Sequence, residues 1–397
     1  MAGLLERLKS NKDDARRDEY YWRIRRHRRL ILYRVTGIII ALAVVGCALY
    51  ISYLNKEYTD YDIASDEDRR DSEDAQYVPY NGNVIKYSRD GAEAFDGRNN
   101  ALWNITFEMQ NPRVATCKGY AALGDFKGNM IYVISAEGQI GEIETKIPIT
   151  TFCVSSQGVV AAVLEDEGST KINLYSPESE LLAEMKCTMT RSGYPIDISL
   201  SEDGMKLAVS YIRVDNGEMK SSVAFYNFDE VGQNEIDNYV SGYDYVDCVI
   251  PKVRFLDNET AFALGDSRLV FYKGAQKPVS ISDILIDEEV RSVYCGENKV
   301  ALVFRDTDNA GGYRVDVYGS DGQLDMRKSI DMAYTDMVIK KDRMIVYNDT
   351  ECEMYKYNGR KKYQGGFKES MLLLVPGDSL TKWTLVNRDT VQSVRLR

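Results

Sequence analysis

A run of 20 residues without a charge, Val35 to Leu54, constrains this chain more than any other feature. At 1.5 Å per residue, a helix of that length spans about 30 Å, the thickness of the hydrocarbon core of a bilayer. Ten of the 20 residues are Leu, Ile or Val, which favour insertion, whereas one Arg near the centre opposes it by about 2.5 to 3.5 kcal/mol. The sequence therefore predicts one transmembrane helix over residues 35–54.

The charge differs in sign on the two sides of this segment. Residues 1–34 carry a net charge of +6 and residues 55–397 a net charge of -17. Because Lys and Arg are retained on the cytoplasmic side, we expect a single-pass protein of the cell membrane, with its N-terminus cytoplasmic and its body extracytoplasmic. The residues expected to set this topology are Arg23, Arg25, Arg26, Arg28, Arg29 and Arg34.

Two other fates of the apolar segment have to be weighed. A cleaved signal peptide usually has an apolar core of about 7 to 15 residues, which is shorter than this one, so an uncleaved signal anchor is favoured. Val44-Val45-Gly46-Cys47 loosely matches a bacterial lipobox, which makes Cys47 a candidate for lipidation. The apolar run continues past Cys47 to Leu54, and this argues against that alternative.

From Gln76 to Arg397 the sequence shows short alternating or apolar runs separated by turn signals, and no helical stretch is predicted. A hairpin recurs, in which an aromatic or β-branched run is followed by a small polar turn and a polar strand. Gly138 and Ser179 mark two such turns 41 residues apart, and Gly322 and Gly359 mark two others 37 residues apart. This spacing is typical of one four-stranded propeller blade per repeat.

The fold class is therefore all-β, a WD40-like or quinoprotein-like β-propeller of a generic blade type, preceded by one transmembrane α-helix. The turns divide the body into blades at 76–109, 110–148, 149–189, 190–243, 244–288, 289–331, 332–369 and 370–397. The last range holds only three strands, so residues 57–66 are expected to supply a fourth and close the ring. Eight blades are favoured, with seven as the alternative.

Four segments follow from these features. They are a basic cytoplasmic tail at 1–34, partly helical; the transmembrane helix at 35–54; an acidic stalk or ring-closing strand at 55–75; and the extracytoplasmic propeller at 76–397.

Several stretches of the body resemble a Gram-positive bacterial envelope family known only as a domain of unknown function, number 5711. They are Glu108 to Pro112, Gln157 to Ala161, Ser192 to Pro195, Val223 to Phe228 with Val231 to Glu235, and Tyr347 to Cys352. The resemblance implies an extracytoplasmic β-propeller behind a single membrane helix. It brings no catalytic residue and no ligand.

The residues argue against most kinds of catalysis and cofactor binding. The only histidine, His27, lies in the basic tail, which leaves the body without a Ser-His-Asp or Cys-His arrangement or a histidine metal site. The six cysteines of the body are scattered, so neither zinc nor a disulfide framework is suggested. Asp306 to Gly311 begins like a calcium loop, but Ala310 and Val317 occupy ligand positions. No cofactor, metal or small-molecule ligand is predicted.

The favoured function is a non-catalytic scaffold that binds an envelope protein or a cell-wall partner. Nucleic acid is excluded as a partner of the body, because a net charge of -17 repels phosphate. Two alternatives stay open. One is an envelope glycan hydrolase that uses a carboxylate pair, and the other is a transmembrane sensor whose output passes through the basic tail.

Overall fold

The computed structural model describes the backbone of residues 2–69, 74–215, 217–307 and 311–397, and the side chains of these residues except 2–19, 23–25, 53 and 54. The side chains of Arg23 and Arg25 therefore lie outside the described residues. Residues 308–310 of the calcium-like loop and residues 70–73 of the expected stalk also lie outside them. The chain forms two units, Met1–Glu57 and Tyr58–Arg397.

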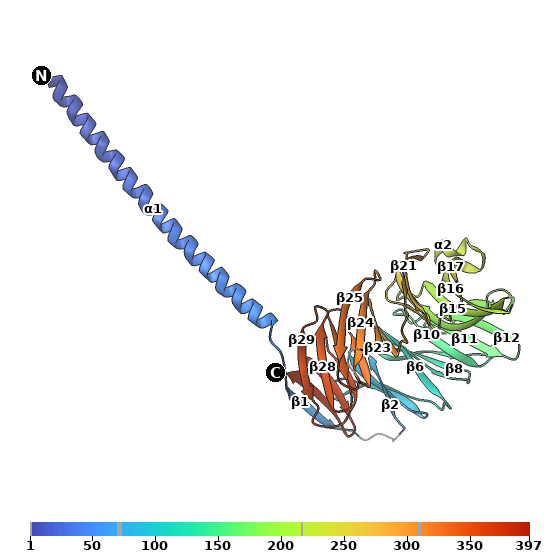
Figure 1. Ribbon diagram of the computed structural model, residues 1–397. Helices are drawn as coiled ribbons and strands as arrows, with labels where there is room; N and C mark the ends of the chain where they lie inside the picture. Colours follow the sequence, from blue (N-terminus) through green and yellow to red (C-terminus); the bar gives the residue numbers. More distant parts are fainter. Residues whose placement is uncertain (1, 70–73, 216, 308–310) are drawn as a thin grey trace. The chain divides into compact units, whose positions relative to one another are not determined.

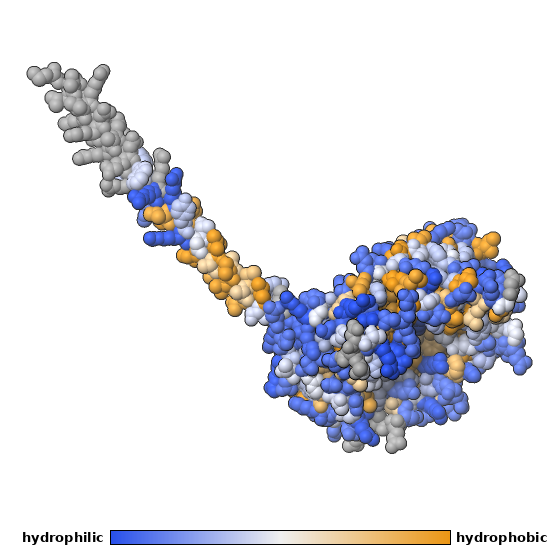
Figure 2. All heavy atoms as spheres, viewed as in Figure 1, coloured by the Kyte–Doolittle hydropathy of each residue, from blue (hydrophilic) through white to orange (hydrophobic). Residues whose placement is uncertain are grey.

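The first unit is one unbroken helix, α1 (Ala2–Leu54), of 53 residues. Within it, Tyr20–Ser52 is long and apolar enough to cross a membrane by length and composition, and the side chains of this segment that the structure describes are all exposed. Figure 2 shows its apolar side chains as a continuous orange stretch. Arg26, Arg28, Arg29 and Arg34 are exposed on the same helix, as is Cys47. An apolar helix of this kind serves as a membrane anchor or as a signal sequence.

The second unit is a β-propeller of eight four-stranded antiparallel sheets, as favoured from the sequence (Figure 1). We number the blades 1 to 8 from residue 76 onward. The strands of blades 1 to 4 are β2 (Gln76–Tyr80), β3 (Asn83–Tyr87), β4 (Gly91–Phe95), β5 (Ala101–Thr106); β6 (Pro112–Cys117), β7 (Tyr120–Asp125), β8 (Met130–Ser135), β9 (Gly138–Glu144); β10 (Ile149–Val154), β11 (Val160–Asp166), β12 (Ser169–Tyr175), β13 (Leu181–Cys187); and β14 (Tyr194–Leu200), β15 (Lys206–Asp215), β16 (Glu218–Asn227), β17 (Tyr239–Val246).

Blades 5 to 8 repeat the same plan, and the last blade takes its fourth strand from the start of the unit. Their strands are β18 (Lys252–Phe255), β19 (Thr260–Leu264), β20 (Arg268–Lys273), β21 (Val279–Leu285); β22 (Ser292–Gly296), β23 (Lys299–Arg305), β24 (Tyr313–Gly319), β25 (Leu324–Ile330); β26 (Asp336–Ile339), β27 (Arg343–Tyr347), β28 (Glu351–Lys356), β29 (Lys361–Gly366); and β30 (Met371–Pro376), β31 (Lys382–Asn387), β32 (Thr390–Leu396), β1 (Tyr61–Asp68).

The recurring aromatic of the sequence repeat occupies one structural position. In blades 1 to 7 the register between the third and fourth strands shifts beside the last turn, as a β-bulge does. Tyr226, Tyr272 and Tyr355 each lie at this shift, and each is buried. The sequence signal therefore marks the residue that packs between blades where the outermost strand changes register.

Eight clusters of buried apolar side chains hold the ring together, and each combines residues of two neighbouring blades. Between blades 1 and 2, for example, Ile85 packs with Leu123 and Ile134. Between blades 8 and 1, Leu373 and Val386 pack with Phe95. Each sheet buries its faces against the neighbouring sheets, so no blade has an apolar core of its own and the clusters stabilise the ring as a whole.

Strand β1 closes the ring by pairing antiparallel with β32, from Tyr61 opposite Leu396 to Asp68 opposite Thr390. Tyr61 is 2% exposed, and its hydroxyl accepts a hydrogen bond of 3.0 Å from the backbone N–H of Lys368. Figure 1 shows blue β1 beside the red C-terminal strands. The ring closure predicted from the sequence is confirmed, with the closing strand at Tyr61–Asp68 where residues 57–66 were expected.

One prediction about the body is wrong, because the segment between β16 and β17 contains two short helices. They are α2 (Glu230–Gln233) and the 3-10 helix η1 (Ile236–Asn238). Segments of four and three residues are too short to show a helical period in the sequence. They lengthen blade 4, which also has the longest strands, β15 and β16, of 10 residues each.

Candidate interaction site in the central channel

The first strand of each blade faces the middle of the ring, where it neighbours the first strands of adjacent blades. These strands surround a central channel with a volume of about 1170 Å³. Its wall comes mainly from β6, β10, β14, β18 and β22 and from the turns beside them. We call the turns between the first and second strands of blades 2 to 7 the channel mouth; they comprise residues 118–119, 155–159, 201–205, 256–259, 297–298 and 340–342.

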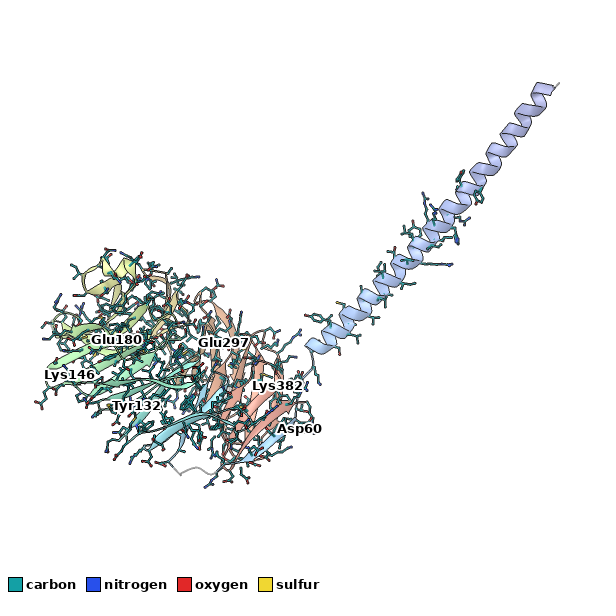
Figure 3. All side chains as sticks on the ribbon, turned by 180° about the vertical axis from the view of Figure 1, so that it is seen from behind. Asp60, Tyr132, Lys146, Glu180, Glu297 and Lys382 are labelled. Atoms are coloured by element: carbon teal, nitrogen blue, oxygen red, sulfur yellow. The ribbon has the colours of Figure 1, made fainter. Side chains whose placement is uncertain are left out.

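Hydrogen bonds between successive blades fix the channel mouth. They are Tyr80 Oη to the carbonyl of Gly119 (2.6 Å), the N–H of Ser156 to the carbonyl of Glu202 (2.9 Å), the N–H of Asp203 to Asn258 Oδ1 (2.7 Å), the N–H of Lys341 to Glu297 Oε2 (2.7 Å) and Arg343 Nη2 to the carbonyl of Gly377 (3.1 Å). Figure 3 labels Glu297 within this part of the ring. The turns are therefore held by their neighbours and not only by their own strands.

One ion pair at the mouth reaches across a whole blade. Lys118 Nζ of blade 2 lies 2.7 Å from Glu202 Oε2 of blade 4. Blade 3 contributes Ser156, whose hydroxyl donates to the carbonyl oxygen of the same Glu202 at 2.7 Å. Glu202 thus connects blades 2, 3 and 4 at one point of the channel mouth.

The inner strand of blade 5 is tied to that of blade 4 on both sides of Arg254. Asp197 Oδ2 accepts the N–H of Val253 at 3.0 Å, and Ser199 Oγ accepts the N–H of Phe255 at 2.9 Å. Val253 and Phe255 are buried, whereas the side chain of Arg254 between them is exposed and lines the channel. The backbone that carries Arg254 is therefore rigid.

Most of the charged groups that line the channel neutralise one another. Lys252 Nζ lies 3.2 Å from Asp197 Oδ2, Lys118 pairs with Glu202, and Lys299 pairs with Asp325. Glu297 lies 3.1 Å from Lys340 Nζ. The two remaining carboxylates accept hydrogen bonds from nearby backbone N–H groups. Asp257 accepts them from Glu259 and Thr260, and Asp321 accepts one from Gln323.

Two lining cations, Arg254 and Lys341, have no side-chain hydrogen-bond or ion-pair partner among the described residues. Arg254 projects from a strand inside the channel, whereas Lys341 belongs to a turn at its mouth. Arg254 and Lys341 are therefore the lining cations without a carboxylate partner among the described residues.

Three cysteines also line the channel: Cys117, Cys153 and Cys295. Burial, helped by the charge of Asp197 and opposed by that of Arg254, raises the pKa of the Cys153 thiol to about 12. Burial likewise raises the pKa of Cys117, helped by Glu202 and opposed by Arg254. Both thiols are therefore neutral near pH 7. All seven cysteines of the chain are unpaired.

A second hollow of about 850 Å³ lies between the outer parts of blades 3 and 4. Tyr211, Tyr226 and Tyr239 line it, with the Tyr211 and Tyr226 hydroxyls 2.9 Å apart and the rings of Tyr226 and Tyr239 in an edge contact. Ile236 of η1, at its rim, is 85% exposed. Both walls mix charges of the two signs, as in the ion pair of Arg213 with Asp244.

The residues singled out from the sequence do not meet in a site. Arg26, Arg28, Arg29, Arg34 and Cys47 all lie on α1. Within the described residues, no group of three or more His, Cys, Asp or Glu side chains is placed to hold a metal ion. Arg254, by contrast, was missed, because a cation in the alternating strand Lys252–Phe255 looks like an ordinary surface residue. Its only sequence signal is its position in the first strand of a blade.

Solved structures share the propeller fold. A eukaryotic initiation factor is 11% identical, with a TM-score of 0.53 and coverage of 85% of this chain and 87% of that one. Sqt1 from Chaetomium thermophilum, solved bound to the N-terminus of ribosomal protein L10, is 12% identical, with a TM-score of 0.52 and coverage of 85% and 100%. BamB from Moraxella catarrhalis is 13% identical, with a TM-score of 0.49 and coverage of 85% and 100%.

At these identities the first two likenesses show the fold alone. No curated protein matches the sequence. A family model described as a family of unknown function, DUF5711, matches residues 54–396. This match covers the propeller from its closing strand to its last strand, and the chain therefore belongs to the DUF5711 family.

Proposed function

We propose that this chain is a single-pass membrane scaffold whose extracytoplasmic propeller binds an envelope protein or a cell-wall partner without catalysing a reaction. The observation that carries the proposal is the channel mouth, where hydrogen bonds between blades hold the turns around a channel lined by two cations, Arg254 and Lys341, that have no partner among the described residues. Rigid scaffolds that present loops in this way are typical binding surfaces.

The helix supports the membrane part of the proposal. Its apolar segment has the length of one crossing. Arg26, Arg28, Arg29 and Arg34 lie before or at the start of the uncharged run, which favours a cytoplasmic N-terminus. The net charge of -17 after the run fits a body on the other side.

The state of the channel carboxylates supports a non-catalytic role. A glycosidase needs two carboxyl groups about 5 to 9.5 Å apart that are available to act on the glycosidic bond. Here Asp197, Glu202 and Asp325 are held in ion pairs, and Asp257 and Asp321 accept hydrogen bonds from turn N–H groups.

A peptide segment is a reasonable kind of partner for this fold. Sqt1, which shares the fold, was solved with the N-terminus of another protein bound. That likeness carries no ligand identity to this chain. It supports only the view that a propeller of this size can hold a chain end.

Site-specific crosslinking in living cells tests the proposal. A photoreactive phenylalanine at Lys341, at the channel mouth, is expected to capture one specific envelope component. The same group at Leu182, which is 57% exposed on the outer strand β13, serves as the matched control. If the same crosslinked products form at Lys341 and at Leu182, or if the only product is a crosslink between copies of this chain, the support for an interaction at the mouth is removed.

Topology is tested separately with a C-terminal alkaline phosphatase fusion. The enzyme folds only outside the cytoplasm, so we expect the natural chain to be active. Exchanging Arg26, Arg28, Arg29 and Arg34 for Glu should reduce that activity, because the charge bias is reversed. An inactive fusion to the natural chain would contradict the proposed orientation.

Deleting residues 2–22 distinguishes a scaffold from a sensor. A scaffold should keep its crosslinked partner and its cellular phenotype after the deletion, provided that Arg23 to Arg34 still orient the helix. Loss of the phenotype with the partner still bound would favour signalling through the tail.

A further inference from the structure

We infer that Arg254 binds a carboxylate of a partner polypeptide that enters the central channel. This inference rests on the proposed function, because it assigns a ligand group to the surface expected to bind a partner. Arg254 thereby determines which chemical group the site binds, and not only where the site lies.

The first reason is that Arg254 is a cation on a channel-lining strand, β18, and has no carboxylate partner among the described residues. Lys118, Lys252 and Lys299 each have a carboxylate partner. Arg254 has none within the part of the chain that the structure describes. A guanidinium binds a planar anion well when the anion accepts two parallel hydrogen bonds from it.

The second reason is that the groups whose charge Arg254 influences do not supply that anion. The electrostatic effect of Arg254 reaches Cys117 in blade 2 and Cys153 in blade 3. Because burial raises the pKa of both thiols, both are uncharged near pH 7. The nearby carboxylates of Asp197 and Glu202 are already paired with Lys252 and Lys118.

The third reason is preorganisation. Asp197 and Ser199 hold the backbone N–H groups of the two residues that flank Arg254. The strand therefore loses little freedom on binding, and only the Arg254 side chain has to be ordered. The channel volume of about 1170 Å³ is large enough to admit an extended chain end.

The charge of the whole propeller limits what kind of acidic ligand can bind. Residues 55–397 carry a net charge of -17, so a polyanion would be repelled at long range. One carboxylate on an otherwise neutral segment avoids this repulsion. We therefore assign a single side-chain or terminal carboxylate, and not an acidic stretch.

Ligand-observed NMR with the full chain in phosphatidylcholine nanodiscs tests the assignment. The probe is an N-acetylated hexapeptide of alternating Gly and Ser with a free C-terminal carboxylate, and its control is the same peptide as the C-terminal amide. The acid should bind the natural chain at least about tenfold more tightly than the amide, since a charged hydrogen-bonded pair is lost. Equal binding of the two peptides, or no binding of the acid, overturns the inference.

Arg254→Gln should weaken binding of the acid peptide at least about tenfold. Arg254→Lys should give an intermediate affinity, because lysine keeps the positive charge but cannot donate two parallel hydrogen bonds from a planar guanidinium. Arg89→Gln is the matched control: Arg89 is exposed in the turn between β3 and β4 and does not line the channel. It should bind as the natural chain does. Unchanged binding by Arg254→Gln, or equal weakening by Arg89→Gln, overturns the inference.

A competition arm separates a carboxylate from a phosphate ligand. Acetate should displace the acid peptide at a concentration no higher than inorganic phosphate requires. Displacement by phosphate at a much lower concentration would overturn the carboxylate assignment. If the Arg254→Gln variant with the photoreactive group at Lys341 still captures the envelope component, the result supports the scaffold proposal and contradicts the role of Arg254.

Discussion

Arg327 Nε and Nη2 donate hydrogen bonds of 2.8 and 2.7 Å to the two carboxylate oxygens of Asp316. The side chain of Asp316 is 2% exposed and that of Arg327 56% exposed, so only the acid depends on its partner for solvation. Arg314 Nε lies 3.5 Å from the same carboxylate and also pairs with Glu288. Inside blade 6, the Asp316 carboxylate is thus held by one close pair with Arg327 and one longer contact with Arg314.

Arg327→Ala should lower the free energy of unfolding by about 1.5 to 3 kcal/mol, because a buried carboxylate loses its bidentate partner. Arg213→Ala is the matched control: its partner Asp244 is 60% exposed, so the loss should stay below about 1 kcal/mol. Urea unfolding of the full chain measures both. Equal losses would mean that burial of the acid is not what gives the pair its strength.

Tyr61→Ala should destabilise the ring by about 3 to 5 kcal/mol, the usual range for deleting a buried aromatic side chain. Tyr61 packs with Trp383 and Tyr363 in the cluster between blades 7 and 8. Ile63→Ala, on the same strand but 38% exposed, should cost far less. Urea unfolding distinguishes the two variants, and a similar small loss for both would contradict a structural role of β1.

Stability should fall at alkaline pH, and Tyr226 should contribute to that fall. Burial raises the pKa of Tyr226 to about 12, whereas in the unfolded chain this tyrosine ionises near its ordinary pKa of 10.0. Between pH 10 and pH 12 the folded state therefore binds more protons than the unfolded state. The contribution of Tyr226 to the free energy of unfolding is fully present below pH 10 and is lost as the pH rises through 12, by up to about 1.4 kcal/mol per pH unit.

Tyr226→Phe removes this contribution. The variant should be about 1 kcal/mol less stable than the natural chain at pH 8, because Tyr211 loses a hydroxyl partner. The difference should shrink as the pH rises above 10. A difference that stays constant between pH 9 and pH 11.5 would contradict the assignment.

Cys153 and Cys352 should resist alkylation in the folded chain. Burial raises the pKa of Cys153 from 9.0 to about 12, which lowers the thiolate fraction at pH 8 by about a thousandfold. Cys352 is 0% exposed, and its pKa is raised as well. Treatment with N-ethylmaleimide followed by peptide mass spectrometry should find both modified in urea and neither in buffer. Rapid modification of Cys352 in buffer would show that blade 7 opens.

The sequence was sufficient for the blade plan because blades are bounded by local turn chemistry. Gly204, Gly322 and Gly359 all have positive φ, which other residues rarely adopt, and each lies in a turn between paired strands. The expected end of blade 4 was three residues short of Val246, the end of β17. The insertion before this strand obscured the spacing.

The channel could not be predicted, since it depends on contacts between distant residues. Lys118 and Glu202 are 84 residues apart, and nothing in either local sequence pairs them. Arg254 acquires its position only when β18 takes its place in the ring, held by Asp197 and Ser199 from another blade. Composition shows how many charges exist, but not which of them remain without a partner.

Pairing of the first strand with the last strand of the ring also sets the order of events during biosynthesis. Strand β1 emerges first, yet its partner β32 is synthesised more than 300 residues later, which takes roughly 15 to 65 seconds at about 5 to 20 residues per second. During that interval its edge is unpaired. Four of its eight residues are acidic, and such charges discourage pairing with the wrong strand. A nascent chain interrupted before Thr390 cannot complete blade 8, so closure of the ring acts as a check that synthesis has reached the last strand.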